Sequence, residues 1–196
     1  MRDLRRDDVP RTIVVIPARG GSKGIPRKNL RSLDGVPLIS YAIRTARALD
    51  ERPLVIVSTD DAEIAVVADK EGAQVHHRAP ELADDATTLD SVIYDAVTSV
   101  EAAMGHRFDL VVTQQPTSPL LRSSSLDAAI ARMLADPSID TTISVTDDTH
   151  LSWRREGDRF VPNYEARVNR QYLTPSYRET GGFLICRRST LTPDSR

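Results

Sequence analysis

Residues 12–29 read T-I-V-V-I-P-A-R-G-G-S-K-G-I-P-R-K-N. The stretch opens with the apolar, β-branched run from Ile13 to Ile16, which Pro17 and a group of glycines follow. This pattern predicts a buried parallel strand. The residues after it contain glycines and Pro26, so we expect a loop there that neither continues the strand nor starts a helix.

The loop is rich in positive charge. Its cationic side chains are Arg19, Lys23, Arg27 and Lys28, with no acidic residue among them. Glycine backbone and fixed cations at the carboxyl end of a strand are what a polyphosphate site needs. A basic surface turn is the alternative, but glycines, cations and strand end together favour phosphate binding.

Two common phosphate-binding motifs do not fit this loop. A P-loop has its lysine after the second glycine and before a Ser or Thr, whereas Lys23 here precedes Gly24 and Ile25 follows. A dinucleotide fingerprint opens straight into a helix. In this chain Pro26, Lys28 and Asn29 intervene, and the first helical pattern begins only near Pro37.

The composition bounds the class of protein. A chain of 196 residues with 40% hydrophobic and 28% charged residues suits one soluble α/β domain. The net charge of -2 argues against a nucleic-acid-binding protein. No apolar run approaches the ~20 residues of a membrane span, so we expect no membrane partner. Residues 1–11 are expected to be a flexible charged lead-in and residues 12–196 one domain.

Apolar runs and amphipathic helical patterns alternate along the chain. Strands are predicted at 13–16, 54–58, 74–77, 109–113, 141–146 and 182–186, and helices at 37–49, 64–72, 89–104 and 126–133. Such alternation predicts a three-layer α/β/α domain with a mostly parallel, Rossmann-like sheet. Residues 147–180 are polar and irregular, which is typical of a functional or interface segment.

Several local interpretations accompany this fold. Asp60, with Glu63 three residues on, is interpreted as a helix cap rather than as an acid that binds ribose. Ser123, Ser124 and Ser125 are expected to precede and cap the helix that holds Leu126. His76 and His77 are adjacent in a strand and point to opposite faces, so they do not form a metal pair. The lone Cys186 lies in an apolar run, is expected in the core, and suits a reducing cytoplasm.

Three polar segments follow predicted strands. They are residues 19–29, 78–88 and 115–122. The carboxyl ends of parallel strands lie at one edge of a sheet, where ligands of open α/β folds bind. The sequence therefore predicts one site built from these three loops.

The motifs in these loops resemble a known family. P-A-R-G-G-S-K-G-I-P-R-K-N at 17–29 is similar to the signature of the acylneuraminate cytidylyltransferases, which activate sialic, Kdo-like or related acids with CTP. Residues 114–122 resemble that family's L-Q-P-T-S-P-L-R, and residues 78–85 its R-x-x-E-L-A-x-D segment. The resemblance covers roughly residues 12–187 and implies a fold of the nucleotide-diphospho-sugar transferase type.

The resemblance also implies roles for individual residues. A hydroxyl of an acidic substrate would attack the α-phosphorus of CTP, with Mg²⁺ as cofactor and pyrophosphate as leaving group. The chain would work as a homodimer in the cytoplasm, with 147–180 completing the dimer contact and the acceptor pocket. The expected catalytic residues are Arg19, Lys23 and Lys28; the nucleotide-binding residues are Ala18, Arg19, Gly20, Ser22, Lys23, Asn29, Arg78, Thr87 and Thr88; and the substrate-binding residues are Gln115, Arg170 and Thr180.

The chain departs from the family pattern where relatives contact the acceptor. Thr180 replaces the Asn of an Asn-Gly pair, Leu184 replaces a Tyr, and residues 150–153 lack the Lys of an H-P-x-K motif. These changes alter the hydrogen bonds that the pocket offers, so a modified nonulosonic acid or another small anion, including a phosphonate, stays open as acceptor.

The metal-binding residues of the family have no evident counterpart here. Relatives carry an Asp-x-Asp some tens of residues after the last strand, whereas this sequence ends at Arg196 and offers only Asp194. We expect a truncated chain, a metal held differently, or no turnover. A nucleotidyltransferase for another base or acceptor, such as an NDP-sugar pyrophosphorylase, and a nucleotide-binding module without turnover are the competing hypotheses.

Overall fold

The computed structural model describes residues 10–22, 24–84 and 87–196. The chain divides into two compact units, and the division falls inside strands β7 (Thr141–Asp147) and β10 (Tyr177–Arg187). We call residues 1–143 with 181–196 the sheet unit and residues 144–180 the hairpin unit. The segment 147–180, predicted to be an interface, lies within the hairpin unit.

The described residues form a six-stranded sheet in the order β5-β4-β1-β6-β10-β7. Strand β1 pairs in parallel with β4 and β6, β4 pairs in parallel with β5, and β10 runs antiparallel to β6. The mostly parallel sheet is therefore confirmed. The remaining bounds are β1 (Thr12–Pro17), β4 (Leu54–Thr59), β5 (Gln74–His77) and β6 (Leu110–Gln114).

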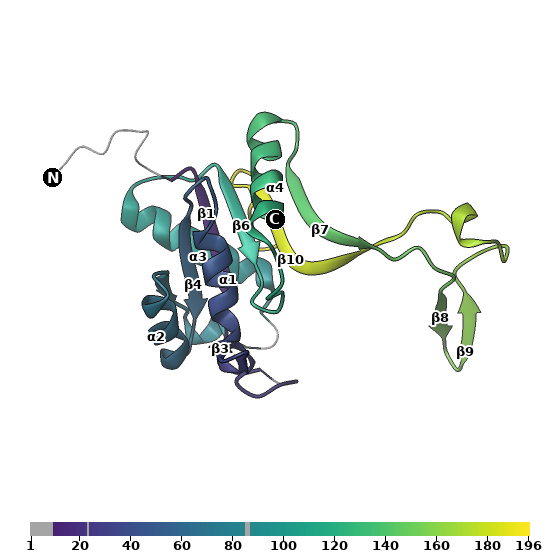
Figure 1. The fold of residues 1–196 in the computed structure, drawn as a ribbon, viewed down its shortest axis with the longest axis horizontal. Helices are drawn as coiled ribbons and strands as arrows, with labels where there is room; N and C mark the ends of the chain where they lie inside the picture. Colours follow the sequence, from purple (N-terminus) through teal and green to yellow (C-terminus); the bar gives the residue numbers. More distant parts are fainter. Residues whose placement is uncertain (1–9, 23, 85–86) are drawn as a thin grey trace. The chain divides into compact units, whose positions relative to one another are not determined.

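Helices cover both faces of the sheet, as Figure 1 shows. Their bounds are α1 (Leu38–Arg47), α2 (Ala62–Lys70), α3 (Leu89–Met104) and α4 (Ser123–Ala135). Side chains alternate across β1: Val14 and Ile16 share a core with α1, α2 and α4, whereas Ile13 and Val15 share a second core with α3. This alternation produces the three layers that the sequence predicted.

Short elements complete the chain. Strands β2 (Ser32–Leu33) and β3 (Val36–Pro37) form a hairpin around Asp34 and Gly35, which both have positive φ, 50° and 79°. Positive φ at both positions is the type I′ turn that suits two-residue hairpins. The others are the 3-10 helices η2 (Lys28–Leu30), η3 (Pro80–Leu82) and η4 (Arg170–Tyr172), and the paired strands β8 (Trp153–Glu156) and β9 (Arg159–Pro162).

Four local predictions need correction. The cap of α2 is Asp61, whose side chain accepts bonds from the Glu63 and Ile64 N–H groups, and not Asp60. Helix α4 begins at Ser123, and its N-cap Arg122 makes no side-chain capping bond, so the serines lie inside the first turn. The basic loop contains a turn of 3-10 helix, η2. Residues 147–180 are less irregular than expected, because β8 and β9 form a hairpin there.

Two other expectations concern the buried cysteine and membrane-spanning helices. Cys186 is fully buried in the sheet unit, and burial raises the pKa of its thiol to about 11, so its assignment to the core is confirmed. Among the described helices, none has the length and apolar character needed to cross a membrane.

Candidate functional site

The sheet topology selects one edge for a ligand. The chain runs from β1 to β4 and β5 on one side and then returns to place β6 on the other side of β1. Loops that leave β1 and β6 therefore diverge, and such a switch point is where open α/β sheets bind ligands.

A cavity of about 560 Å³ lies at this edge. Its volume falls within the ~300–1,000 Å³ typical of small-molecule sites. It brings together the three segments that the sequence analysis placed there. The lining residues are Pro17, Arg19, Ser22, Gly24, Ile25, Lys28, Asn29, Arg78, Leu82, Asp84, Thr87, Leu89, Val92, Gln115, Pro116 and Thr117.

The predicted site residues fall into four groups, of which the last lies in the hairpin unit. Those that line the cavity are Arg19, Ser22, Lys28, Asn29, Arg78, Thr87 and Gln115. Three others lie beside it in the sheet unit: Ala18 is fully buried, Gly20 donates its N–H to Asp60, and Thr88 is the N-cap of α3. Lys23 lies outside the described residues.

Two predicted substrate residues belong to the hairpin unit. Arg170 forms an ion pair with Asp147, with 3.3 Å between Nη2 and Oδ2. The Thr180 and Ser144 hydroxyl oxygens are 2.7 Å apart. Their roles toward a substrate stay predictions.

Two hydrogen bonds fix the beginning and the end of the basic loop. The Ala18 N–H donates to the Ser58 carbonyl at 2.9 Å, which extends the pairing of β1 with β4. Asn29 is 5% exposed and its Nδ2 donates to the Arg19 carbonyl at 3.1 Å. Asn29 thus ties the two ends of the loop together, a role that sequence reasoning did not assign to it.

Arg78 is a buried cation at the floor of the cavity. Its Nη2 donates to the Ser58 carbonyl at 2.8 Å and its Nε to the Ser58 hydroxyl at 3.3 Å. Burial lowers the pKa of this guanidinium, and the charge of Asp60 opposes that shift. Hydrogen bonds on two nitrogens orient the group without neutralising it, so the cavity keeps a fixed positive charge.

Asp84 lines the cavity and makes hydrogen bonds to both Thr87 and the basic loop. Its Oδ1 accepts from both the N–H and the hydroxyl of Thr87, each at 2.7 Å. Its carbonyl accepts from Arg19 Nη1 at 3.3 Å, which links this segment to the basic loop. An acid three residues before Thr87 was the available sequence signal for this turn.

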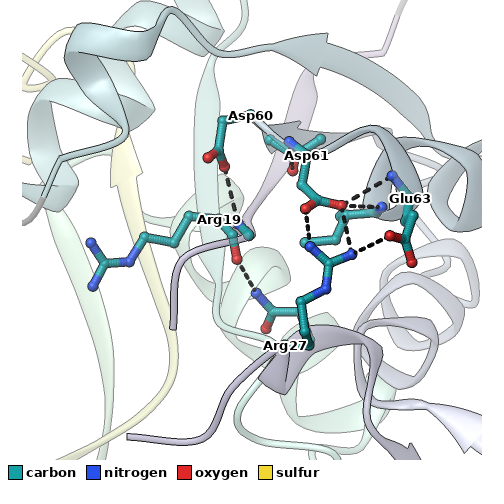
Figure 2. Close-up of polar contacts among 9 residues, drawn as sticks. Arg19, Arg27, Asp60, Asp61 and Glu63 are labelled. Atoms are coloured by element: carbon teal, nitrogen blue, oxygen red, sulfur yellow. Dashed lines mark hydrogen bonds and ion pairs between the residues drawn. The ribbon is translucent and has the colours of Figure 1, made fainter. Parts of the chain in front are cut away.

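The basic loop does not direct all its cations to the cavity. Arg27 binds Asp61 and also Glu63, with 2.9 Å between Nη2 and Oε1 of Glu63. Figure 2 shows the Arg19 side chain extending away from this cluster. Local carboxylates therefore already pair with Arg27, which is not among the residues that line the cavity.

The cavity also has an apolar wall. Leu82, Leu89, Val92 and Pro116 contribute to the lining beside the polar groups. A surface of this kind can pack against a flat heterocycle while the cations bind an attached anion. The arrangement suits a molecule with an apolar ring at one end and phosphate at the other.

The expected Mg²⁺ is not matched by a protein cage. Within the described ranges, no three His, Cys, Asp or Glu side chains are grouped to hold a metal ion. Asp84 is the one carboxylate among the described residues that line the cavity, and its Oδ1 already accepts two hydrogen bonds from Thr87. These donors do not make a magnesium site by themselves.

Comparisons with known proteins identify the family of this chain. The family described as "Cytidylyltransferase" matches residues 13–156. N-acylneuraminate cytidylyltransferase A of Danio rerio is 35% identical over 186 residues, covering 90% of this chain and 41% of that protein. CMP-N,N'-diacetyllegionaminic acid synthase of Legionella pneumophila is 38% identical over 121 residues, covering 61% of this chain and 52% of that protein.

A solved structure shares the fold. CMP:2-keto-3-deoxy-manno-octonic acid synthetase complexed with CTP aligns with a TM-score of 0.67 over 92% of this chain and 76% of that chain, at 18% identity. The present chain spans 41% and 52% of the lengths of the two curated relatives above.

Proposed function

Because this chain belongs to the cytidylyltransferase family, we propose that it transfers CMP from CTP to a hydroxyl of a small sugar acid. One structural observation carries the proposal. The cavity at the carboxyl end of β1 combines an apolar wall with Arg19, Lys28 and Arg78. A pyrimidine and a triphosphate require these two surfaces side by side.

The reaction is a displacement at phosphorus. The acceptor hydroxyl loses its proton to solvent as its oxygen bonds to the α-phosphorus of CTP. The bond from that phosphorus to the oxygen bridging to the β-phosphate breaks, and pyrophosphate leaves with the bonding electrons. Charge builds up on the leaving group, so fixed cations that contact it lower the barrier.

Each loop has a place in this reaction. Arg19 and Lys28 bind the triphosphate, together with Lys23. Arg78 is held against Ser58 and faces the cytosine edge, and Ser22, Asn29, Thr87 and Thr88 support the nucleotide. Gln115 lines the same cavity and presents its amide to the acceptor. Mg²⁺ bound to the triphosphate would neutralise part of its charge, and this ion usually binds substrate phosphates and few protein groups.

The acceptor is proposed to be a sialic or nonulosonic acid, or another small anion. The names of the two relatives motivate the first choice, and the changes at Thr180 and Leu184 keep the second open. Arg170 is proposed to bind the acceptor carboxylate. The hairpin unit exposes Trp153 and Tyr172, which supports a homodimer that forms through that unit. The enzyme is proposed to be cytoplasmic.

Pyrophosphate release tests the proposal. The purified chain is incubated with CTP, Mg²⁺ and a panel of sugar acids and phosphonates. Lys28→Ala should lower turnover at least ~100-fold, the scale of one lost transition-state donor. Lys70→Ala, at the C-terminal end of α2, is the control and should keep wild-type turnover.

The other outcomes separate the alternatives. CTP binding without pyrophosphate release would favour a nucleotide-binding module. Turnover with a different nucleotide would favour another nucleotidyltransferase. Equal turnover in Lys28→Ala and Lys70→Ala would remove the phosphate role of Lys28.

A further inference from the structure

Two adjacent carboxylates at the end of β4 contact the basic loop at separate points. Asp60 Oδ1 accepts the Gly20 N–H at 3.0 Å, near the start of the loop. Asp61 binds the guanidinium of Arg27, which lies near the end of the loop. Figure 2 shows both carboxylates directed toward the loop. The proposed reaction gives neither acid a role, and acids beside a triphosphate site need a physical reason.

Arg27 has an unusual backbone that its side chain helps to hold. Its φ and ψ are 57° and 31°, the left-handed region that non-glycine residues rarely adopt. The residue directly precedes η2, which contains Lys28 and Asn29. The guanidinium binds Asp61 and Glu63 on helix α2 and its cap, so α2 anchors the point where the loop reverses.

Helix α2 in turn fixes Asp61. Its Oδ1 accepts the Glu63 and Ile64 N–H groups, each at 3.0 Å. Burial pushes the pKa of Asp61 upward, but the bonds from Ile64 and Arg27 outweigh it and the pKa is lowered. The carboxylate therefore stays charged and immobile at a helix N-terminus.

Gly20 fits against the same pair of acids. A Cβ at Gly20 would lie 2.5 Å from Asp61 Oδ2, so only glycine allows this approach. Gly20 is thus bonded to Asp60 and packed on Asp61. Asn29 Nδ2 also donates to the Arg19 carbonyl, which ties the beginning of the loop to its end.

We propose that Asp60 and Asp61, with Arg27 as partner, are positioning residues that hold Arg19 and Lys28 in place for the triphosphate. The inference rests on the proposed function for the identity of the ligand. Preorganising a loop lowers the entropy lost on binding and so raises affinity. Arg27 also neutralises Asp61, which would otherwise repel the bound phosphates.

CTP titrations test the positioning role. Arg27→Ala should weaken CTP binding at least tenfold, because the loop loosens and Asp61 is left unpaired. Asp61→Ser keeps a residue that caps helices well and removes only the charge, so its effect should be smaller. The double variant should bind CTP more tightly than the sum of the two losses predicts.

Raising the salt concentration should shrink the effect of Arg27→Ala on CTP affinity. Arg27→Lys should recover part of the affinity that Arg27→Ala loses.

A second ion pair supplies the matched control. Arg44 binds Glu71 through two nitrogens, at 2.9 and 2.7 Å, and neither residue lines the cavity. Arg44→Ala therefore breaks a comparable arginine–carboxylate pair on the other end of α2. Its CTP affinity should equal that of the wild type. Equal affinities in Arg27→Ala and Arg44→Ala would overturn the proposal.

Hydrogen exchange in the unliganded protein separates this inference from the proposed function. Asp60→Ala should speed exchange of the Gly20 amide at least tenfold. Arg27→Ala and Asp61→Ser should do the same for the amides of Lys28 and Leu30, which donate within the turn. Unchanged exchange overturns the positioning role even if CTP binds. Failure of the wild type to bind CTP refutes the proposed function, while the exchange data still decide whether the acids hold the loop.

Discussion

The sheet unit and the hairpin unit are stabilised by different interactions. The sheet unit has apolar cores on both faces of the sheet, and strand β1 has no exposed side chain from Ile13 to Ile16. Within residues 144–180, all of which the structure describes, Thr149 alone is buried, while Phe160 is 70% and Tyr172 74% exposed. The hairpin unit relies on backbone pairing and exposed ion pairs.

Because of this difference, substitutions in the two units can test folding stability and chemistry separately. Burial of apolar area is the dominant favourable term in folding, and the sheet unit contains both the cores and the whole cavity. Exposed side chains in the hairpin unit bury little apolar area and so add little to stability. Substitutions in the two units should therefore have effects of very different size.

The largest contrast is expected between two truncations of apolar side chains. Ile43 on α1 is fully buried, so Ile43→Ala should lower the free energy of unfolding by about 2–5 kcal/mol. Phe160→Ala removes a larger but exposed side chain and should change it by less than ~0.5 kcal/mol. Urea denaturation measures both. Equal losses would show that the hairpin unit is buried in solution by a contact that a single chain does not reveal.

Replacement of a buried polar residue in the sheet unit should raise stability, whereas truncation of a buried apolar residue lowers it. Gln114 on β6 is fully buried, and neither atom of its amide has a hydrogen-bond partner among the described residues. Gln114→Leu should raise the free energy of unfolding by about 1–3 kcal/mol, since an unpaired buried polar group is removed. Gln74→Leu, at an exposed position of β5, is the control. A loss of stability in Gln114→Leu would mean that the amide has a partner, such as a bound water.

The free energy of unfolding should also depend on pH, through a histidine of the sheet unit. His76 on β5 is half-buried; burial lowers its pKa below the ordinary 6.5, while Asp95 opposes the shift. The unfolded chain therefore binds a proton more readily than the folded one, so stability is present above about pH 6.5 and declines as the pH falls toward the folded pKa. His76→Asn should flatten this slope in chemical denaturation between pH 7 and 5. An unchanged slope would contradict the assignment to His76.

The smallest effect is expected at an exposed ion pair of the hairpin unit. Arg154 Nε lies 2.8 Å from Glu156 Oε1, and both side chains are 56% exposed. Exposed pairs contribute roughly 0–1 kcal/mol and are screened by salt. Glu156→Gln should shift the melting temperature by no more than about 1–2 °C. A larger shift that persists at high salt would indicate a structural role for this carboxylate.

Apolar periodicity accounts for the parts of the fold that were predictable. The strands around Ile13, Val55 and Val111 and the helix 89–104 were all predicted close to their observed bounds, because each has a buried face. Hairpin β8–β9 was missed because its side chains are mostly exposed and show no alternation. The turn at Gly157 and Asp158 was its available signal. The antiparallel direction of β10 was also unpredictable, since a strand pattern reads the same either way.

The candidate site was predicted in outline and missed in its electrostatic detail. Sequence spacing located the three loops, but it could not show that Arg27 pairs with carboxylates on another element. Asp60 and Asp61 both match a capping pattern, and the bonds that the Asp61 side chain accepts from the Glu63 and Ile64 N–H groups assign the cap to Asp61. The ion pairs of Arg27 join residues distant in sequence, and such pairs cannot be predicted from local spacing.

The buried thiol on β10 gives the molecule a built-in reporter. Cys186 is the one cysteine in the sequence, it is fully buried, and burial raises its pKa to about 11. Alkylating reagents attack the thiolate, so labelling must wait until β10 separates from β6. The rate of alkylation in the unmodified chain therefore times the opening of the sheet, without any introduced probe.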